Sequence, residues 1–464
     1  MAEEAQLQIL MLPWLAQGHI NPFVNLSKAL GSHGDVKVWI VSTPVNISRI
    51  RSRLQGEPIH LLELPLPSVD GLPPGVESTA DIKPESAHLL HRAFDQLDKL
   101  FESLLRRLSP NFVVYDVAGP WAATVASQLE IPSFVFSVYS PAAFGIFLGH
   151  AKRAGSSRDV KAEDLKQAPD GYPLPSVSWK MFEARLMLSN YIALADRIWV
   201  CCQRSCGRLI KSCFEEEDKY LQYLNHLTGK PVISIGPLML PEAGAPREDT
   251  SGNYLIEWLD KQRPSSVVFV SFGSESFLSV EQITQLALAL VDIGRPFLWS
   301  LRSSDGTSSA LSLFPEGFEG RTRDRGLVVG GWVPQVSIVS HRSVGSYVTH
   351  GGWSSVMEAW LYSGLPLVLI PLRHDQGLNC RQIALELNAG IVVERNEEGC
   401  FSREDVCKAV SMVMGDGEKG EQIRSRVREL RGVIDLNTGR QQAYMVELVN
   451  HLKRLLISRK ETSV

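Results

Sequence analysis

The segment LQILMLPWLAQGHINPFVNLSKAL, residues 7–30, contains the pattern that decides the fold of this chain. Residues 7–13 form a short apolar run, as expected for a buried β-strand. The apolar residues after it recur at helical spacing, namely Ile20, Phe23, Val24 and Leu30. A strand followed directly by an amphipathic helix is the beginning of a βαβ unit, in which helices join parallel strands.

The same alternation continues along the chain and predicts two α/β domains. Further short apolar runs occur at residues 36–41, 112–115, 133–136, 267–270, 297–301, 327–329, 345–348 and 367–370. Helical patterns lie between them, the clearest over residues 85–108 and 121–129. The segment LPEAGAPREDTSGN has no periodicity and is rich in proline, glycine and charge, which is typical of a linker. We therefore predict doubly wound α/β domains over residues 1–239 and 254–440, a linker over 240–253, and a closing helical segment over 441–464.

Composition excludes several classes of function. Of the 464 residues, 44% are apolar and 21% charged, as in globular domains. Forty-seven basic residues against 51 acidic ones, with no dense basic block, exclude a nucleic-acid partner. The seven cysteines lack the spacing of zinc or redox sites. No apolar run approaches the roughly 18 residues that span a bilayer. We expect a cytoplasmic monomer without a membrane span.

Two polar residues follow predicted strands in the first half. Ligands of open α/β sheets bind beyond the carboxyl ends of the strands. His19 follows the first strand and precedes a helix, while Asp116 follows residues 112–115, so both lie at one sheet edge. The positive end of the helix favours a neutral imidazole, and a carboxylate can orient it to deprotonate a bound hydroxyl. Taken alone, each has a simpler explanation: helix capping or a loop hydrogen bond for His19, a strand-end cap for Asp116.

The second half contains a denser signal, with WVPQ at residues 332–335, THGGWSSVMEAW at 349–360 and IPLRHDQ at 370–376. His350 comes just after a predicted strand, and Gly351 and Gly352 permit a tight turn. Ser354 and Ser355 then open a helix whose free N–H groups attract a diphosphate. This part of the chain predicts an anion cradle.

A structural alternative explains only part of the segment. Ser355 and Glu358 match the S-x-x-E capping box, which leaves Trp332 and Gln376 without a role. The indole of Trp332 can stack on a base, Glu358 can accept ribose hydroxyls, and Asp375 and Gln376 can hydrogen-bond a sugar. The segment therefore indicates a nucleotide-sugar site.

The stretch from residue 332 to 376 closely resembles the signature box of plant family 1 glycosyltransferases. The resemblance extends to QGH at residues 17–19, YD at 115–116 and VSFGS at 270–274, so it covers essentially the whole chain. Members of this family have the GT-B fold, two Rossmann-like domains with parallel sheets that face across a cleft. Their final helix returns to the first domain, which is what the resemblance implies for residues 441–464.

The resemblance also assigns roles to individual residues. His19 is implied as the base and Asp116 as its partner. The implied donor site has Trp332 and Val333 against uracil, Gln335 and Glu358 on the ribose, Ser274, His350, Gly352, Ser354 and Ser355 around the diphosphate, and Trp353, Asp375 and Gln376 on the sugar. His341 also matches the box, but from its place after a short helix we interpret it as structural.

This chain departs from the family pattern in three places. Gly351 stands where Cys is usual, Ser354 where Asn is usual, and one extra residue lies between Glu358 and Gly364. The shorter Ser354 side chain reduces the polar reach beside the diphosphate. We expect the phosphate-binding segment to keep its fold, because glycine at position 351 only increases the conformational freedom of the backbone.

These observations predict an inverting glycosyltransferase. We expect it to move glucose from UDP-glucose, as co-substrate, to a hydroxyl of a small plant natural product, with UDP-rhamnose as the alternative donor. Segments 65–79 and 375–383 resemble the branch that often extends sugars already on flavonoid or terpenoid glycosides. No metal is expected, since no Asp-x-Asp pair accompanies the diphosphate cradle.

Two other classes of protein fit the sequence less well. A nicotinamide oxidoreductase would ordinarily carry G-x-G-x-x-G after the first strand, where this chain has LAQGHINP. A catalytically inactive nucleotide-sugar binding protein is the remaining alternative, and a missing His19 or Asp116 would favour it.

Overall fold

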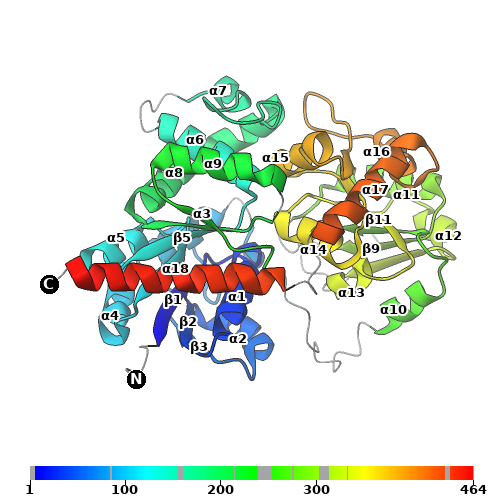
Figure 1. Ribbon diagram of the computed structural model, residues 1–464. Coiled ribbons are helices and arrows are strands. Elements are labelled where there is room, and N and C mark those ends of the chain that lie inside the picture. Colours follow the sequence, from blue (N-terminus) through cyan, green and yellow to red (C-terminus); the bar gives the residue numbers. More distant parts are fainter. Residues whose placement is uncertain are drawn as a thin grey trace.

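The structure is a computed structural model that describes residues 6–83, 86–154, 160–213, 215–238, 253–273, 276–302, 313–331, 333–433 and 439–462. It contains two α/β halves, each built around one parallel sheet (Figure 1). The predicted fold class is therefore confirmed. The predicted linker lies outside the described residues except for Asn253, which begins a helix.

The first half is built on a seven-stranded sheet with the order β3-β2-β1-β4-β5-β6-β7, in which every neighbouring pair is parallel. Its strands are β1 (Leu7–Leu12), β2 (Val36–Ser42), β3 (Ile59–Glu63), β4 (Phe112–Asp116), β5 (Ser133–Ser137), β6 (Gly207–Ile210) and β7 (Val232–Ser234). Strands β3, β6 and β7 were not predicted, and neither was β13 (Gly390–Val392) of the second half. β3 contains His60 and Glu63, β6 contains Arg208, and β7 and β13 have only three residues each, so none stands out as an apolar run.

The second half is built on a six-stranded sheet with the order β10-β9-β8-β11-β12-β13. Its strands are β8 (Val267–Ser271), β9 (Phe297–Leu301), β10 (Gly326–Gly330), β11 (Val344–Thr349), β12 (Leu367–Leu369) and β13 (Gly390–Val392). All its neighbouring pairs are parallel as well.

Helices cover both faces of each sheet, which explains why the central strands are apolar throughout. Along β1, Leu10 and Leu12 belong to one buried cluster, and Ile9 and Met11 to the cluster on the opposite face. In the first half the helices are α1 (Gln17–Gly31), α2 (Pro44–Arg51), α3 (Ala87–Asp95), α4 (Asp98–Leu108), α5 (Pro120–Gln128), α6 (Pro141–Ala154), α7 (Ala162–Lys166), α8 (Met181–Arg204) and α9 (Asp218–Thr228). In the second half they are α10 (Asn253–Asp260), α11 (Val280–Ile293), α12 (Phe318–Thr322), α13 (Gln335–Val339), α14 (Trp353–Ser363), α15 (Gln376–Arg381), α16 (Arg403–Met414) and α17 (Glu418–Val433).

The single helix predicted over residues 85–108 is wrong in one respect. The structure divides it into α3 and α4, with the fully buried Leu97 at the turn between them. The amphipathic pattern continues through this turn, so periodicity alone does not reveal the break.

The final helix, α18 (Arg440–Thr462), lies along the first half of the molecule (Figure 1). Met445, Leu448, Val449 and Leu452 are buried in the same cluster as strands β1 and β4. Full burial of such a side chain contributes about 1.5–3 kcal/mol, so the helix is part of the first core. Gln441 anchors its beginning, because Oε1 accepts a hydrogen bond from the Leu238 backbone N–H at 2.9 Å.

The strand orders place a topological switch point in each half. In the first sheet the order reverses between β1 and β4, and in the second between β8 and β11. Open α/β sheets bind ligands beyond the carboxyl ends of the strands at such points. The residues that follow these four strands are therefore the first candidates for a functional site.

Candidate active site

At the first switch point the structure brings His19 and Asp116 together. Asp116 is the last residue of β4, and His19 lies in the first turn of α1, directly after β1. His19 Nδ1 lies 2.8 Å from Asp116 Oδ2, and the two side chains are 17% and 1% exposed. A carboxylate only accepts hydrogen bonds, so Nδ1–H is the donor and Nε2 is the basic ring nitrogen.

The simpler explanations for these two residues fare differently. The residue that caps α1 is Ala16, which has no side-chain capping bond, so His19 does not cap the helix. Asp116 does stabilise its strand end, because Oδ1 accepts a hydrogen bond from the Ala118 N–H at 3.2 Å. One carboxylate thus holds both the turn after β4 and the imidazole of His19.

At the second switch point His350 follows β11, and its ring lies between two glycines. A Cβ on Gly352 would lie 2.5 Å from His350 Nε2, and one on Gly273 would lie 2.9 Å from Cε1. Burial, with the nearby Arg373, lowers the pKa of His350 to about 4. His350 is therefore neutral at pH 7 and can offer a diphosphate a hydrogen bond but no positive charge.

Helix α14 begins beside His350, with Gly352 as its N-cap and no side-chain capping bond. Ser354 and Ser355 lie in the first turn, whose backbone N–H groups have no partner within the helix. Ser355 is inside the helix, so the capping box with Glu358 does not form, and that structural alternative is wrong.

The glycine that replaces the usual cysteine also has a physical reason. Gly351 has φ +80°, and a Cβ there would lie 2.4 Å from Cys380 Sγ. The thiol of Cys380 already fills the space that a side chain at position 351 would need, and the backbone conformation itself favours glycine. The extra residue before Gly364 is accommodated within α14, which ends on Gly364 at φ 63°.

The residues predicted to hold the ribose form one hydrogen-bonded cluster. Gln335, the first residue of α13, donates from Nε2 to Glu358 Oε2 at 2.7 Å and to Ser355 Oγ at 3.3 Å. Its Oε1 accepts from the Tyr347 hydroxyl at 3.1 Å. Val333, which precedes α13, is buried. The network fixes the Glu358 carboxylate, whose remaining acceptor capacity suits vicinal hydroxyls.

Asp375 and Gln376 lie at the amino end of α15, which follows β12. Asn379 donates from Nδ2 to Asp375 Oδ2 at 2.8 Å and to the Gly351 carbonyl at 3.0 Å. Gln376 Oε1 accepts from the N–H groups of Leu372 and Arg373, so its contact with a sugar would use the amide N–H. Asn379 was not predicted as a site residue, because α15, with the sequence QGLNCR, has several polar residues and no local pattern distinguishes Asn379 from the others.

Ser274 and Trp332 lie outside the described residues. Trp353 is packed in the core edge-to-face against Trp360, and its Nε1 has no hydrogen-bond partner within the described part of the chain. Its side chain is a packing element, so a contact with the donor would come from its backbone. His341 bonds Ser343 and Asp260, in agreement with its structural interpretation.

Contacts between the halves bring the two carboxyl edges face to face. Ser140, after β5, donates to Asn379 Oδ1 at 2.8 Å, and Lys211, after β6, donates from Nζ to Ser354 Oγ at 3.1 Å. Lys211 was not predicted, because β6 was not predicted. Polar residues that follow strands are the first candidates for a site in α/β sheets, so a predicted β6 would have pointed to Lys211.

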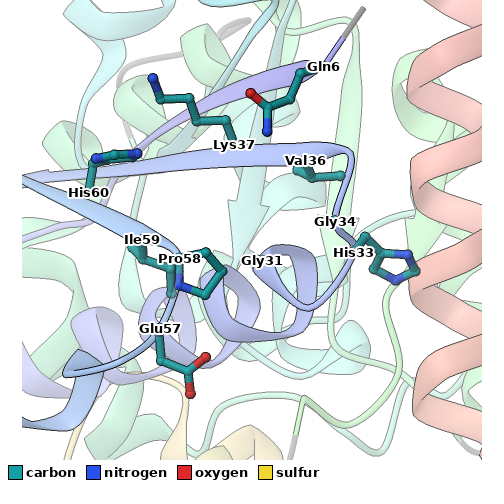
Figure 2. A pocket seen from close by; sticks show the side chains of 10 residues that line it. All are labelled: Gln6, Gly31, His33, Gly34, Val36, Lys37, Glu57, Pro58, Ile59 and His60. Atoms are coloured by element: carbon teal, nitrogen blue, oxygen red, sulfur yellow. The ribbon is translucent and has the colours of Figure 1, made fainter. Parts of the chain in front are cut away.

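The pocket in Figure 2 lies at the other edge of the first sheet. It has a volume of about 470 Å³ and is lined by Gln6, Lys37 and His60, at the amino ends of β1, β2 and β3. None of the predicted site residues lines it. It is therefore separate from the candidate active site.

Among the described residues, no group of three or more His, Cys, Asp or Glu side chains is arranged to hold a metal ion. None of the described helices combines the length and apolar content needed to cross a membrane.

Two doubly wound domains whose carboxyl edges meet have the GT-B architecture, and here one edge carries a His–Asp pair and the other a helix amino terminus. Comparison with protein families agrees. Residues 5–240 match the model "Glycosyltransferase, N-terminal domain", and residues 246–429 match "UDP-glucoronosyl and UDP-glucosyl transferase". The chain belongs to this family, as a plant family 1 UDP-glycosyltransferase that uses a UDP-sugar as co-substrate.

Individual relatives cover nearly the whole chain. It is 37% identical to an anthocyanidin-3-O-glucoside rhamnosyltransferase of Petunia hybrida, over 96% of each chain. It is 34% identical to a mogroside IIIx synthase of Siraitia grosvenorii, over 92% of this chain and 93% of the relative. A crystal structure from Glycyrrhiza uralensis, in complex with glycyrrhetinic acid 3-O-monoglucuronide, superposes with a TM-score of 0.81 at 26% identity, covering 98% of each chain.

Proposed function

We propose that the enzyme transfers glucose from UDP-glucose to a hydroxyl of a small plant natural product, with inversion at the anomeric carbon. The observation that carries this proposal is the His19–Asp116 hydrogen bond of 2.8 Å at the edge that faces the donor cradle. An oriented imidazole with a basic Nε2 is the general base that transfer to an alcohol requires.

The proposed reaction is a single displacement. His19 Nε2 accepts the proton of the acceptor hydroxyl as its oxygen bonds to the anomeric carbon and the bond to the diphosphate breaks. Asp116 stabilises the imidazolium that forms. The N–H groups at the beginning of α14, with Ser354, Ser355 and neutral His350, stabilise the leaving diphosphate, a preorganised role that needs no metal. Gln335 and Glu358 hold the ribose, and Asp375 and Gln376 the sugar.

The sugar itself has two candidates. Gln376 is the residue that the family associates with glucose, and because its Oε1 is held by two backbone N–H groups, its amide N–H would serve the sugar. It supports UDP-glucose. UDP-rhamnose is the second candidate, because a relative at 37% identity is described as a rhamnosyltransferase.

For the acceptor we propose a flavonoid or terpenoid that already carries a sugar. The descriptions of the Petunia and Siraitia relatives name a glucoside and a mogroside. We also propose that the enzyme is a monomer in the cytoplasm; its seven free cysteines support a reducing compartment.

A donor-by-acceptor screen tests the proposal. Purified enzyme is incubated with UDP-glucose or UDP-rhamnose and matched pairs of aglycones and their glucosides, and products are identified by mass spectrometry. We expect a hexose added to the glucosides, in the β configuration by NMR. Added deoxyhexose would replace the proposed donor, and transfer only to aglycones would replace the proposed acceptor. An α-linked glucose, which would keep the anomeric configuration of UDP-α-glucose, would overturn the single displacement.

A further inference from the structure

Lys211 is a buried lysine to which the proposed mechanism gives no role. It follows β6 directly, at the carboxyl edge of the first sheet, and only 4% of its surface is exposed. Its Nζ donates a hydrogen bond to Ser354 Oγ, in the first turn of α14, at 3.1 Å. Lysine is almost never this buried unless its charge is paired, and here the hydrogen-bond partner is a neutral hydroxyl.

The carboxylates around Lys211 are engaged elsewhere. Within the described residues Lys211 forms no ion pair, although Glu358, Asp375, Cys213 and Glu217 act on it through space. Glu217 Oε2 accepts from the Ser212 hydroxyl and the Cys213 N–H. Asn379 donates to the Asp375 carboxylate, and Gln335 donates to the Glu358 carboxylate. Burial is the strongest influence, and it lowers the pKa of Lys211 to about 8. Its charge is therefore undercompensated.

The neighbouring helix terminus adds to this positive potential. The first N–H groups of α14 point out of the helix, and the helix dipole makes this end equivalent to roughly half a positive charge. An ammonium group placed against it is unfavourable unless an anion lies between them. Two independent features, a buried cation from the first half and a helix terminus from the second, thus converge on one place.

We propose that Lys211 is a donor-binding residue, which contacts the diphosphate of the UDP-sugar from the first domain while α14 holds it from the second. This inference rests on the proposed function. Lys211 supplies a positive charge that the neutral His350 does not, and the short side chain of Ser354 leaves room for it. The same charge stabilises UDP as it leaves, so the donor bridges the two domains.

The test compares UDP with uridine, which share the base and ribose but differ in the diphosphate. Binding of each is measured by calorimetry for wild type, Lys211→Met and Lys211→Arg. We expect Lys211→Met to weaken UDP binding about ten- to a hundredfold, the range for hydrogen bonds to charged groups, and to leave uridine binding unchanged. Lys211→Arg keeps the charge and should retain most of the UDP affinity.

Lys219→Met is the matched control. Lys219 also belongs to the first half and forms an ion pair with Glu386 of the second half, but Glu386 has no place in the proposed donor site. Lys219 is itself partly exposed, and the Tyr220 hydroxyl still donates to the buried Glu386 carboxylate when Lys219 is lost. The change removes a contact between the halves and should leave UDP affinity within about twofold.

Three results separate the possibilities. Unchanged UDP affinity in folded Lys211→Met would overturn the inference, and so would an equal loss of uridine and UDP affinity, which would indicate a structural role. A wild-type enzyme that does not bind UDP would instead overturn the proposed function. Should Lys211→Met fail to fold in a thermal melt, Lys211→Gln, which can still bond Ser354 without the charge, gives the same comparison.

Discussion

The two sheets have the same order of their first six strands, to which the first sheet adds β7, but their carboxyl edges present different chemistry. The first edge carries a titratable pair, with His19 Nδ1 2.8 Å from the Asp116 carboxylate. The second carries a helix terminus, a histidine kept neutral by burial, and the hydrogen-bonded pair Gln335 and Glu358. In the proposed mechanism, proton transfer takes place at one switch point and donor binding at the other. Changes at the first edge should alter turnover, and changes at the second should alter affinity.

The largest expected effect is at the first edge. His19→Ala removes the proposed base and should lower kcat by about 10²–10⁴, the usual contribution of general base catalysis, while UDP binding stays near wild type. Steady-state kinetics and UDP calorimetry measure the two quantities. His60→Ala is the control, because His60 is an exposed histidine at the amino edge of the same sheet. A His19→Ala variant with the wild-type kcat would contradict the assignment of proton transfer to the first edge.

A smaller effect is expected at the second edge. Glu358→Gln keeps the shape of the side chain but loses the charged acceptor for the ribose hydroxyls. UDP affinity should fall about tenfold to a hundredfold, with kcat at saturating donor nearly unchanged. The pattern to look for is a raised KM for the donor. A lower kcat with an unchanged KM would mean that Glu358 takes part in the chemical step, which would contradict its assignment to donor binding alone.

The pH dependence of UDP binding tests the role of Lys211, which lies where the two edges meet. The pKa of Lys211 is lowered to about 8, and only its protonated form pairs with a diphosphate. UDP affinity should therefore hold below pH 8 and fall several-fold as the pH rises toward 10. Lys211→Arg should flatten this profile, since arginine keeps its proton throughout. A wild-type profile that stays flat to pH 10 would contradict the assignment.

The smallest effect is expected from chelation. The proposed stabilisation of the leaving diphosphate comes from helix N–H groups and side chains, so EDTA should leave turnover unchanged within error. Activity that EDTA abolishes and Mg²⁺ or Mn²⁺ restores would show that the second edge binds the donor through a metal.

The two edges also differ in how readily the sequence reveals them. Apart from Ser274, the second was predicted from one contiguous segment, residues 332–376. The first depends on His19 and Asp116, which are 97 positions apart and meet only because β1 and β4 are neighbours. The two strands were predicted as apolar runs, and parallel topology placed both residues at one sheet edge. That β1 and β4 are neighbours was not predicted.

What could not be predicted depends on weaker strands and on side-chain packing. Lys211 was missed because β6 has four residues and contains the buried Arg208. The fit of Cys380 against Gly351 requires the distance between two helix ends, which no local pattern encodes. The Ser355–Glu358 capping box failed because the helix begins two residues earlier, at Trp353.

The central claim is that His19 and Asp116 act as one unit, and a double-mutant cycle tests it most directly. The values of kcat are measured for wild type, His19→Ala, Asp116→Asn and the double variant, with circular dichroism to show that all four are folded. If Asp116 works by orienting His19, the double variant should be nearly as active as His19→Ala, because the carboxylate has nothing left to orient. If the two losses instead multiply in full, the pair does not act as a unit, and Asp116 keeps only its role in the turn after β4.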